Sequence, residues 1–139
     1  MSDSVFRILV ALVFIGHGLG HGLAVLPFVG FKLSKTHSAE SRILRERVGP
    51  GVNRGICLLL FMAALISFVA AGAALAEWGF HGRTWENLAL AGSFLSFAGL
   101  AIFWDAYPFL FPNKVGVIVV NAATILVILV FRWPASLFS

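Results

Sequence analysis

The sequence predicts an all-α integral membrane protein, folded as an antiparallel bundle of four transmembrane helices. Of its 139 residues, 60% are apolar and only 12% are charged, and the mean hydropathy is +0.96. Soluble domains carry about 25% charged residues, so this composition excludes an ordinary water-soluble protein. Four segments contain no Lys, Arg, Asp or Glu and are long enough to cross a bilayer: residues 8–31, 55–76, 87–104 and 115–131. The lipid bilayer is therefore the first expected partner.

The expected spans extend slightly beyond these uncharged runs, to residues 5–30, 53–77, 87–107 and 114–132. The first span is longer than the apolar core of a secretory signal, which is about 7 to 15 residues, so we interpret it as an uncleaved span. The third span is expected to end before Pro108, because proline removes a backbone donor and restricts the residue before it. The chain is too short for a second domain, so residues 1–139 are expected to form one transmembrane domain.

Positive charge is concentrated on one side of the predicted bundle. The basic residues of the first connection are Lys32, Lys35, Arg42, Arg45, Arg47 and Arg54. Lys114 lies in the third connection, whereas Arg7, Arg83 and Arg132 lie on the other side. By the positive-inside rule the first and third connections are cytoplasmic and both termini are outside, in a bacterial inner membrane or another cytoplasmic membrane. The distribution of charge therefore predicts the orientation of the chain in the membrane, and no nucleic-acid partner is expected.

Residues 34–48 form a basic, weakly amphipathic stretch within the first connection. The part from residue 38 to 48 can form a short helix before Gly49-Pro50-Gly51 stops it. Two interpretations remain open: an interfacial segment that rests on anionic headgroups, or a solvated loop that only sets the topology.

The most informative motif is Gly16-His17-Gly18-Leu19-Gly20-His21-Gly22, in the middle of the first span. At 100° per residue, the large aliphatic residues of this span form one stripe, which should face lipid: Ile8, Leu12, Ile15, Leu19, Leu23 and Leu26. The two histidines are one turn apart on the opposite face. Because imidazoles are costly in hydrocarbon, this face is predicted to point inward.

Four glycines flank the histidines as two GxxxG pairs, Gly16 with Gly20 and Gly18 with Gly22. Each glycine lowers helix propensity by about 0.8 to 1.0 kcal/mol relative to alanine, so a packing or functional gain must offset the loss. GxxxG pairs allow a neighbouring helix to approach closely. The glycines are therefore predicted to pack against helices, including those of a protein partner or of a second copy of this chain.

Counting along the helices predicts which polar residues share a depth. At a rise of about 1.5 Å per residue, His17 lies near the membrane midplane and His21 about 6 Å closer to the cytoplasm. The same count places Asp105 near the level of His21 and Asn121 near the level of His17. His17, His21, Asp105 and Asn121 are therefore the candidate residues of a ligand-binding or cofactor-binding site.

Asp105 is the most costly member of this patch. An ionised Asp in a span costs about 2.5 to 3.5 kcal/mol on insertion scales, so Asp105 requires a cation. His21 is the expected partner, with Lys114 or Arg54 as alternatives at the interface. An imidazole paired in this way could relay protons or hold a quinone carbonyl by a hydrogen bond.

Metal and haem ligation are weaker interpretations of the two histidines. A zinc or copper site needs further ligands beside His17 and His21, and only Asp105 is a good candidate. Bis-histidine haem ligation needs imidazoles from opposite sides of the porphyrin, which neighbours on one helix do not supply. A single histidine could ligate haem or another pigment together with a second subunit.

The run Phe14-Ile15-Gly16-His17-Gly18-Leu19-Gly20-His21, after Arg7-Ile8-Leu9-Val10, resembles the first helix of the DoxX-like family of small four-span membrane proteins. In that family an Arg-led apolar run precedes a His-Gly-Leu step and a Lys, and His21 stands where the Lys would be. The resemblance implies an antiparallel four-helix bundle. For some members it also implies a link to thiosulfate:quinone oxidoreduction or to thiol stress.

Three functions remain open from the sequence. The first is a redox membrane component that binds a quinone at the polar patch. The second is a non-catalytic accessory subunit of a larger respiratory or photosynthetic complex, which packs through its glycines and ligates a haem or pigment. The third is a pathway for protons or small solutes through His17 and His21. The sequence assigns no catalytic residue.

Overall fold

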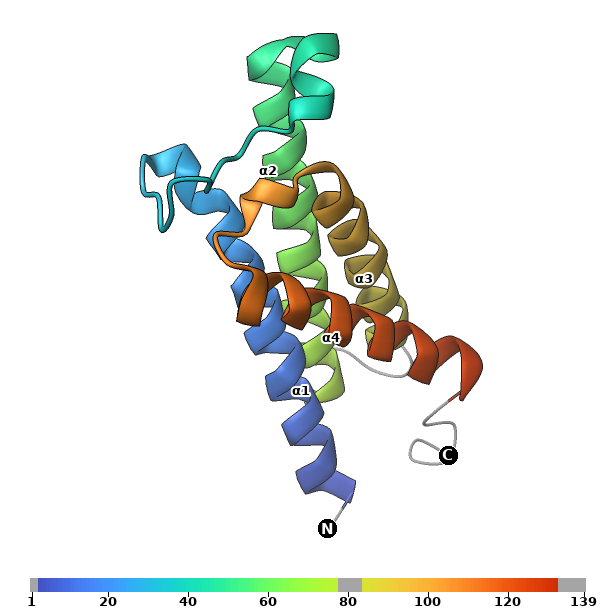
Figure 1. Cartoon of the computed structure of the whole chain (residues 1–139). Helices are drawn as coiled ribbons and strands as arrows, with labels where there is room; N and C mark the ends of the chain where they lie inside the picture. The colour runs from blue at the N-terminus through green and yellow to red at the C-terminus, as the bar shows by residue number, and fades with distance from the viewer. Residues whose placement is uncertain (1–2, 78–83, 133–139) are drawn as a thin grey trace.

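The computed structural model describes residues 3–77 and 84–132, and within them it confirms the antiparallel all-α fold (Figure 1). Arg83 lies outside the described residues. The main helices are α1 (Asp3–Gly20), α2 (Arg42–Leu75), α3 (Thr84–Ile102) and α4 (Val115–Ile125). The helical segments long and apolar enough to cross a membrane are Ser4–Val29, Arg42–Leu75, Thr84–Ile102 and Leu110–Val130. The chain is therefore a four-span membrane protein whose apolar helices contact lipid.

The first span changes its helical form near the histidines. Helix α1 is followed directly by η1 (His21–Val29), a 3-10 helix that contains Pro27. Gly30 ends this element with a left-handed backbone, φ 81°, and donates its N–H to the carbonyl of Pro27. On the lipid-facing side Ile8 and Leu19 are exposed, whereas His21 is fully buried. The burial at these positions agrees with the two predicted faces. Farther along the stripe the agreement is partial, because Ile15 lies against Gly72 of α2, and Leu12 and Leu23 line a cavity that His17 also lines.

Helix α2 joins the basic segment to the second span. It begins at Arg42, eleven residues before the expected start of the span at 53, and the Ser41 side chain accepts a hydrogen bond from the Leu44 N–H at its N-terminus. The helix is interrupted at Gly49, which has φ 77° and ψ 164°, a backbone conformation that glycine adopts without steric cost. Pro50 then starts the long straight part, where a missing N–H costs little. Figure 1 shows the short turquoise part set at an angle to the green span.

Helix α2 is the centre of the bundle and packs against both α1 and α3. Its buried aromatic residues Phe61 and Phe68 belong to two apolar clusters, one toward each end of the bundle. Gly72 brings α1 and α2 together, because a Cβ atom at this position would lie 2.7 Å from the backbone oxygen of Ala11. A small residue at position 72 thus determines how closely the first two spans approach.

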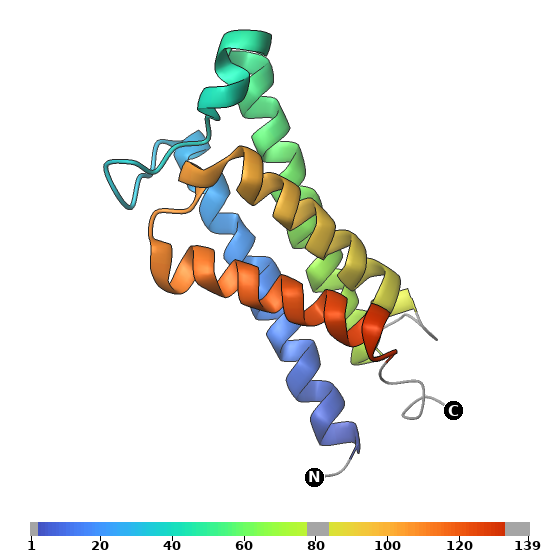
Figure 2. The ribbon, with the colours of Figure 1, turned by 45° about the vertical axis from the view of Figure 1, so that its right-hand side comes forward.

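Helix α4 crosses the other three obliquely (Figures 1 and 2). It packs mainly against α3 and makes few contacts with α1. The preceding segment η3 (Leu110–Lys114) brings the chain beside the middle of α1, and η4 (Leu126–Val130) continues α4 away from it. Because α1 and α4 diverge, cavities lie between them.

Candidate functional site

A chain of three polar side chains joins three helices inside the bundle. The Nε2 atom of His17 lies 3.0 Å from Oδ1 of Asn121, and Nδ2 of Asn121 donates to Oγ of Ser96 over 2.6 Å. Asn121 and Ser96 are fully buried and His17 is half-buried. Because the Asn121 amide N–H₂ faces Ser96, its carbonyl oxygen accepts from His17, which places the imidazole proton on Nε2. The structure therefore brings together His17 and Asn121, as the depth count predicts, and adds Ser96.

The second histidine has a different partner from the expected one. Nδ1 of His21 forms a hydrogen bond with the hydroxyl of Tyr107. The imidazole is stacked between Phe61 and Phe68, with ring centroids at 6.1 and 5.7 Å, and it is fully buried. Its Nε2 atom has no hydrogen-bond partner among the described residues. His21 is thus held by aromatic rings and one phenol.

Tyr107 is a site residue that the sequence did not single out. It is the only tyrosine in a chain with 14 phenylalanines, and it is 1% exposed. Burial, with a smaller contribution from the neighbouring Cys57, raises the pKa of the Tyr107 phenol, so the hydroxyl stays protonated in the folded protein. The sequence held one signal for this role, because the chain's single tyrosine stands at the expected end of the third span.

The expected pairing of His21 with Asp105 is wrong. Helix α3 ends at Ile102, and Asp105 lies after it in the 3-10 turn η2 (Trp104–Ala106), not in the span. There its side chain is 31% exposed and its Oδ2 lies 4.0 Å from Nε of Arg42. Because this turn faces the basic segment rather than the bundle interior, an arginine reaches Asp105 and the buried imidazole does not.

Neither alternative partner of Asp105 takes that role. Lys114 is buried, and its Nζ lies 4.6 Å from the centre of the Trp104 ring, an arrangement typical of a cation–π interaction. Arg54 lies 3.8 Å from a carboxylate oxygen of Glu40 and over the ring of Phe28. Asp105 therefore belongs to the polar end of the molecule and is separate from the buried histidines.

The two histidines lie edge to face, with ring centroids 4.9 Å apart. Their nearest polar partners are the Asn121 amide and the Tyr107 phenol, which are not the ligands that zinc or copper prefers. In residues 3–77 and 84–132 no group of three or more His, Cys, Asp or Glu side chains is placed to hold a metal ion. The residues around the pair favour hydrogen bonding over metal ligation.

The two glycine pairs have different surroundings. A Cβ atom at Gly18 would lie 3.0 Å from the Leu65 carbonyl oxygen and from Phe68, so this side of α1 packs tightly on α2. Gly16 and Gly20 would meet nothing within 4 Å. In the Gly18–Gly22 pair, Gly18 has the predicted packing role, and a Cβ at Gly22 would make an ordinary contact with Leu65 at 3.8 Å. The Gly16–Gly20 pair is left open toward α4.

The open glycines line a groove between α1 and the start of α4. Its volume is about 420 Å³, and its polar lining comes from His17, Tyr107 and Asn113. A second cavity of about 310 Å³ adjoins it farther toward the N-terminus of α1 and shares Val13 and Val120 with it. The second cavity is almost wholly apolar and is lined by residues such as Phe6, Val10, Val127 and Ile128. Together the two cavities form a long groove with one polar end.

The fold and this site define the class of the molecule: a small four-span membrane protein with a buried His–Asn–Ser chain beside an amphipathic groove. No protein-family model matches the chain, and comparison with curated proteins and with solved structures finds no match. The resemblance to the DoxX-like family therefore depends on the residues of the first span and on the number of spans.

Proposed function

We propose that this protein binds a membrane quinone or quinol in the α1–α4 groove, with the ring beside His17 and the hydrocarbon chain along the apolar cavity. The observation that carries the proposal is the position of His17 at the polar end of a groove that is otherwise mostly apolar. Ligand sites of this kind have volumes of about 300 to 1,000 Å³ and only a few polar groups, which fix the orientation of the ligand.

The hydrogen bonding of His17 suits a quinol. Since Nε2 donates to Asn121, the neutral ring leaves Nδ1 as an acceptor, and among the described residues the hydrogen bond of this ring is the one at Nε2. Nδ1 can accept a hydrogen bond from a quinol hydroxyl, or donate one to a quinone carbonyl when the ring is protonated. Tyr107 and Asn113 line the same end of the groove, and the Asn113 side chain offers a further polar contact.

The shape of the groove suits a molecule with a long apolar chain. The polar end is formed by the second half of α1, whereas Phe6 and Val10 place the apolar cavity beside its first half. Leu12 and Val13 are exposed at the mouth, so the groove opens toward lipid. With the basic end cytoplasmic, as the positive-inside rule predicts, the ring would lie nearer the cytoplasm than the chain.

The test is equilibrium binding of short-chain ubiquinone and menaquinone analogues, oxidised and reduced, to the purified protein in nanodiscs. Quenching of tryptophan fluorescence is a direct readout, because Trp85 lines the apolar cavity. His17→Leu is expected to weaken binding about 3- to 10-fold, the effect of one lost hydrogen bond. Gly16→Leu is expected to block binding without unfolding the protein, since nothing lies within 4 Å of a Cβ at this position.

Leu19→Met, on the exposed lipid-facing stripe, is the matched control and should bind like the unaltered protein. Undiminished binding by both His17→Leu and Gly16→Leu would overturn the proposal. A second candidate, an accessory subunit that docks a partner helix on the open Gly16–Gly20 face, predicts a different result: no quinone binding, and a larger complex in native membranes that Gly16→Leu dissociates.

A further inference from the structure

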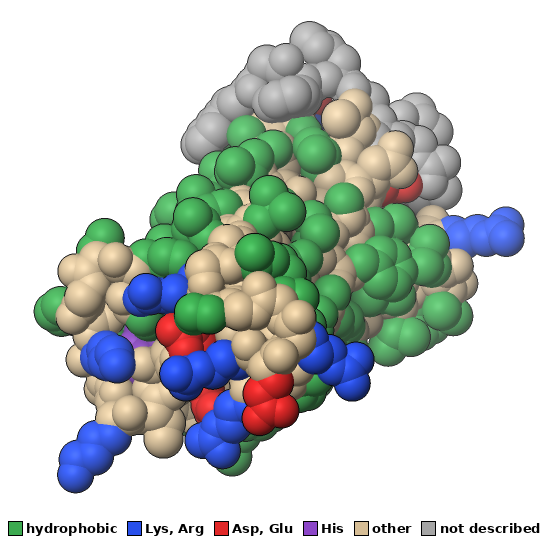
Figure 3. All heavy atoms as spheres, turned by 90° about the horizontal axis from the view of Figure 1, so that it is seen from above, with side chains coloured by type: hydrophobic (Ala, Val, Ile, Leu, Met, Phe, Trp, Pro, Cys, Tyr) green, Lys and Arg blue, Asp and Glu red, His purple; other side chains and the backbone are tan. Residues whose placement is uncertain are grey.

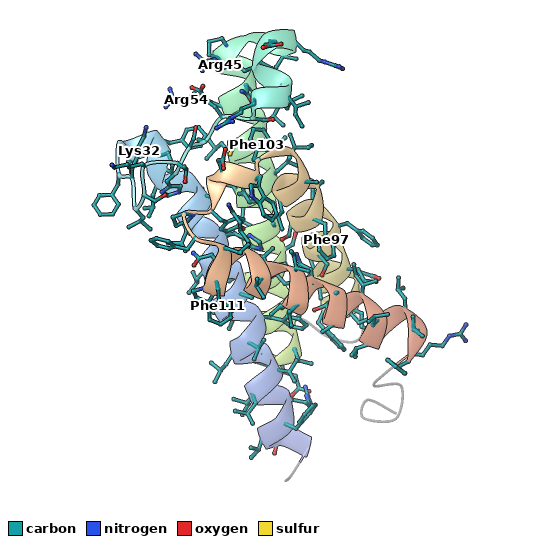
Figure 4. All side chains as sticks on the ribbon, viewed as in Figure 1. Lys32, Arg45, Arg54, Phe97, Phe103 and Phe111 are labelled. Carbon is teal, nitrogen blue, oxygen red and sulfur yellow. The ribbon has the colours of Figure 1, made fainter. Side chains whose placement is uncertain are left out.

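A separate polar pocket of about 320 Å³ lies at the basic end of the bundle. It is formed by the loop after η1, the start of α2 and the turn that carries Asp105. Figure 3 looks onto this end and shows blue basic side chains gathered around a few red acidic ones, and Figure 4 shows Lys32, Arg45 and Arg54 at the same end. This pocket shares no lining residue with the α1–α4 groove.

The pocket has more positive than negative charge. Four of its lining residues are basic, Lys32, Lys35, Arg42 and Arg45, and two are acidic, Glu40 and Asp105. Both carboxylates already have arginine neighbours: Glu40 lies 3.6 Å from Arg45 and 3.8 Å from Arg54, and Asp105 lies 4.0 Å from Arg42. Among the described residues no carboxylate lies within 4.0 Å of Lys32 or Lys35. These two lysines are therefore available to an anion.

Buried hydrogen bonds fix the walls of the pocket. His37 is fully buried, with Nδ1 accepting from the Leu33 N–H over 3.2 Å and Nε2 donating to the Leu23 carbonyl over 3.0 Å. Asn53, also fully buried, holds both the N–H and the carbonyl of Ser41, at 3.1 and 2.9 Å. The backbone of the loop that carries these cations is therefore preorganised before a ligand arrives.

The backbone of the third connection closes the other side of the pocket. The Ser38 N–H donates to the Asp105 carbonyl over 2.9 Å, which ties the loop to the turn after α3. Val29 at the end of η1 and Phe31 and Leu33 on the loop that follows are exposed apolar residues. An apolar edge beside a cationic pocket matches the boundary between acyl chains and headgroups in a bilayer.

We propose that this pocket is a binding site for a phosphate group, carried by an anionic phospholipid or present as free phosphate, with Lys32 and Lys35 as its main charged contacts. The site needs no quinone in the groove and is independent of the proposed function. It would fix the basic end of the protein to one lipid rather than to an averaged negative surface.

The test is native mass spectrometry of the detergent-purified full chain with phosphatidylglycerol, phosphatidylcholine or inorganic phosphate. One phosphatidylglycerol, or one phosphate, is expected to bind at low ligand excess. Each of Lys32→Gln and Lys35→Gln is expected to weaken this binding about fivefold, the effect of one basic residue at an anionic surface. Lys35→Arg, which keeps the charge, should retain most of it.

Arg47→Gln is the matched control, because it removes the same charge from the same end but from a residue outside the pocket. Retention of the lipid that phosphate cannot displace would assign the site to phospholipid, whereas phosphate binding that excludes the lipid would assign it to the free ion. Equal losses in Lys35→Gln and Arg47→Gln, or equal binding of the two phospholipids without phosphate binding, would overturn the proposal.

Discussion

His17 and Asn121 are 104 positions apart in the chain, yet Nε2 of His17 donates to Oδ1 of Asn121 over 3.0 Å. Since Asn121 also holds Ser96, one amide side chain joins α1, α3 and α4. A buried amide without these partners would be costly in hydrocarbon. The position of α4, and with it the groove beside His17, therefore depends on Asn121.

Replacing Asn121 by leucine is expected to destabilise the bundle. Interhelical hydrogen bonds in membrane proteins contribute about 0.6 kcal/mol on average and up to about 1.7, and this change removes two of them. Thermal unfolding in detergent should show a lower midpoint for Asn121→Leu. The control is Val119→Leu, at an exposed position two residues away on α4, and its midpoint should be unchanged. Equal midpoints for both variants would contradict the structural role of Asn121.

Two glycine-to-alanine changes on facing helices are expected to have opposite effects. At Gly72 the new methyl group would lie 2.7 Å from the Ala11 carbonyl oxygen and 2.6 Å from Ile15, so the free energy of unfolding should fall by about 1 to 3 kcal/mol. At Gly16 no atom lies within 4 Å, and alanine has the higher helix propensity. Gly16→Ala should therefore be neutral or stabilising. Denaturant unfolding in mixed micelles measures both changes, and an equally harmful Gly16→Ala would show that this face is packed.

Tyr107 should titrate abnormally, and because it is the only tyrosine in the chain its phenolate absorbance can be followed directly. Burial raises the pKa of the folded phenol, whereas the unfolded chain ionises at about pH 10. Between these two pKa values the unfolded state carries fewer protons, so stability falls as pH rises above about 10. The absorbance of the native protein should stay that of the phenol at this pH until it unfolds. Ordinary titration of the native protein would show that Tyr107 is accessible.

His21 and Tyr107 should be coupled in a double-mutant cycle. Tyr107→Phe leaves both ring nitrogens of His21 without a partner among the described residues and should cost about 1 to 3 kcal/mol of stability, the penalty for a buried unsatisfied group. Adding His21→Leu removes the stranded imidazole, so the double variant should recover part of that loss. Strictly additive effects in thermal unfolding would contradict a direct hydrogen bond.

Much of the fold follows from the sequence because hydrophobic length and helical phase are local properties. The uncharged runs predict four spans, and the phase of α1 separates exposed Ile8 and Leu19 from buried His21. The rise per residue is constant enough to place Asn121 beside His17. These predictions succeed because each depends on one helix or on a simple count along it.

The partner of Asp105 could not be predicted in the same way. The count assumes that the third span continues to residue 107, but the chain leaves the helix at Phe103, whose φ of −117° and ψ of 57° are not helical. This break turns Asp105 toward Arg42 and leaves Tyr107 buried against His21. Whether a residue at a helix end faces the interior or the interface depends on the neighbouring elements, which the count ignores.

The sequence by itself determined the membrane class, the inward histidine face and the close approach expected at the glycines. It could not distinguish the Gly18–Gly22 pair from the Gly16–Gly20 pair, because both have the same spacing on one helix. Only the tertiary structure decided between them: α2 covers Gly18, whereas α4 crosses obliquely and leaves Gly16 and Gly20 open. Helix crossing angles result from side chains that meet across the bundle, so the groove beside His17 exists only in the assembled fold.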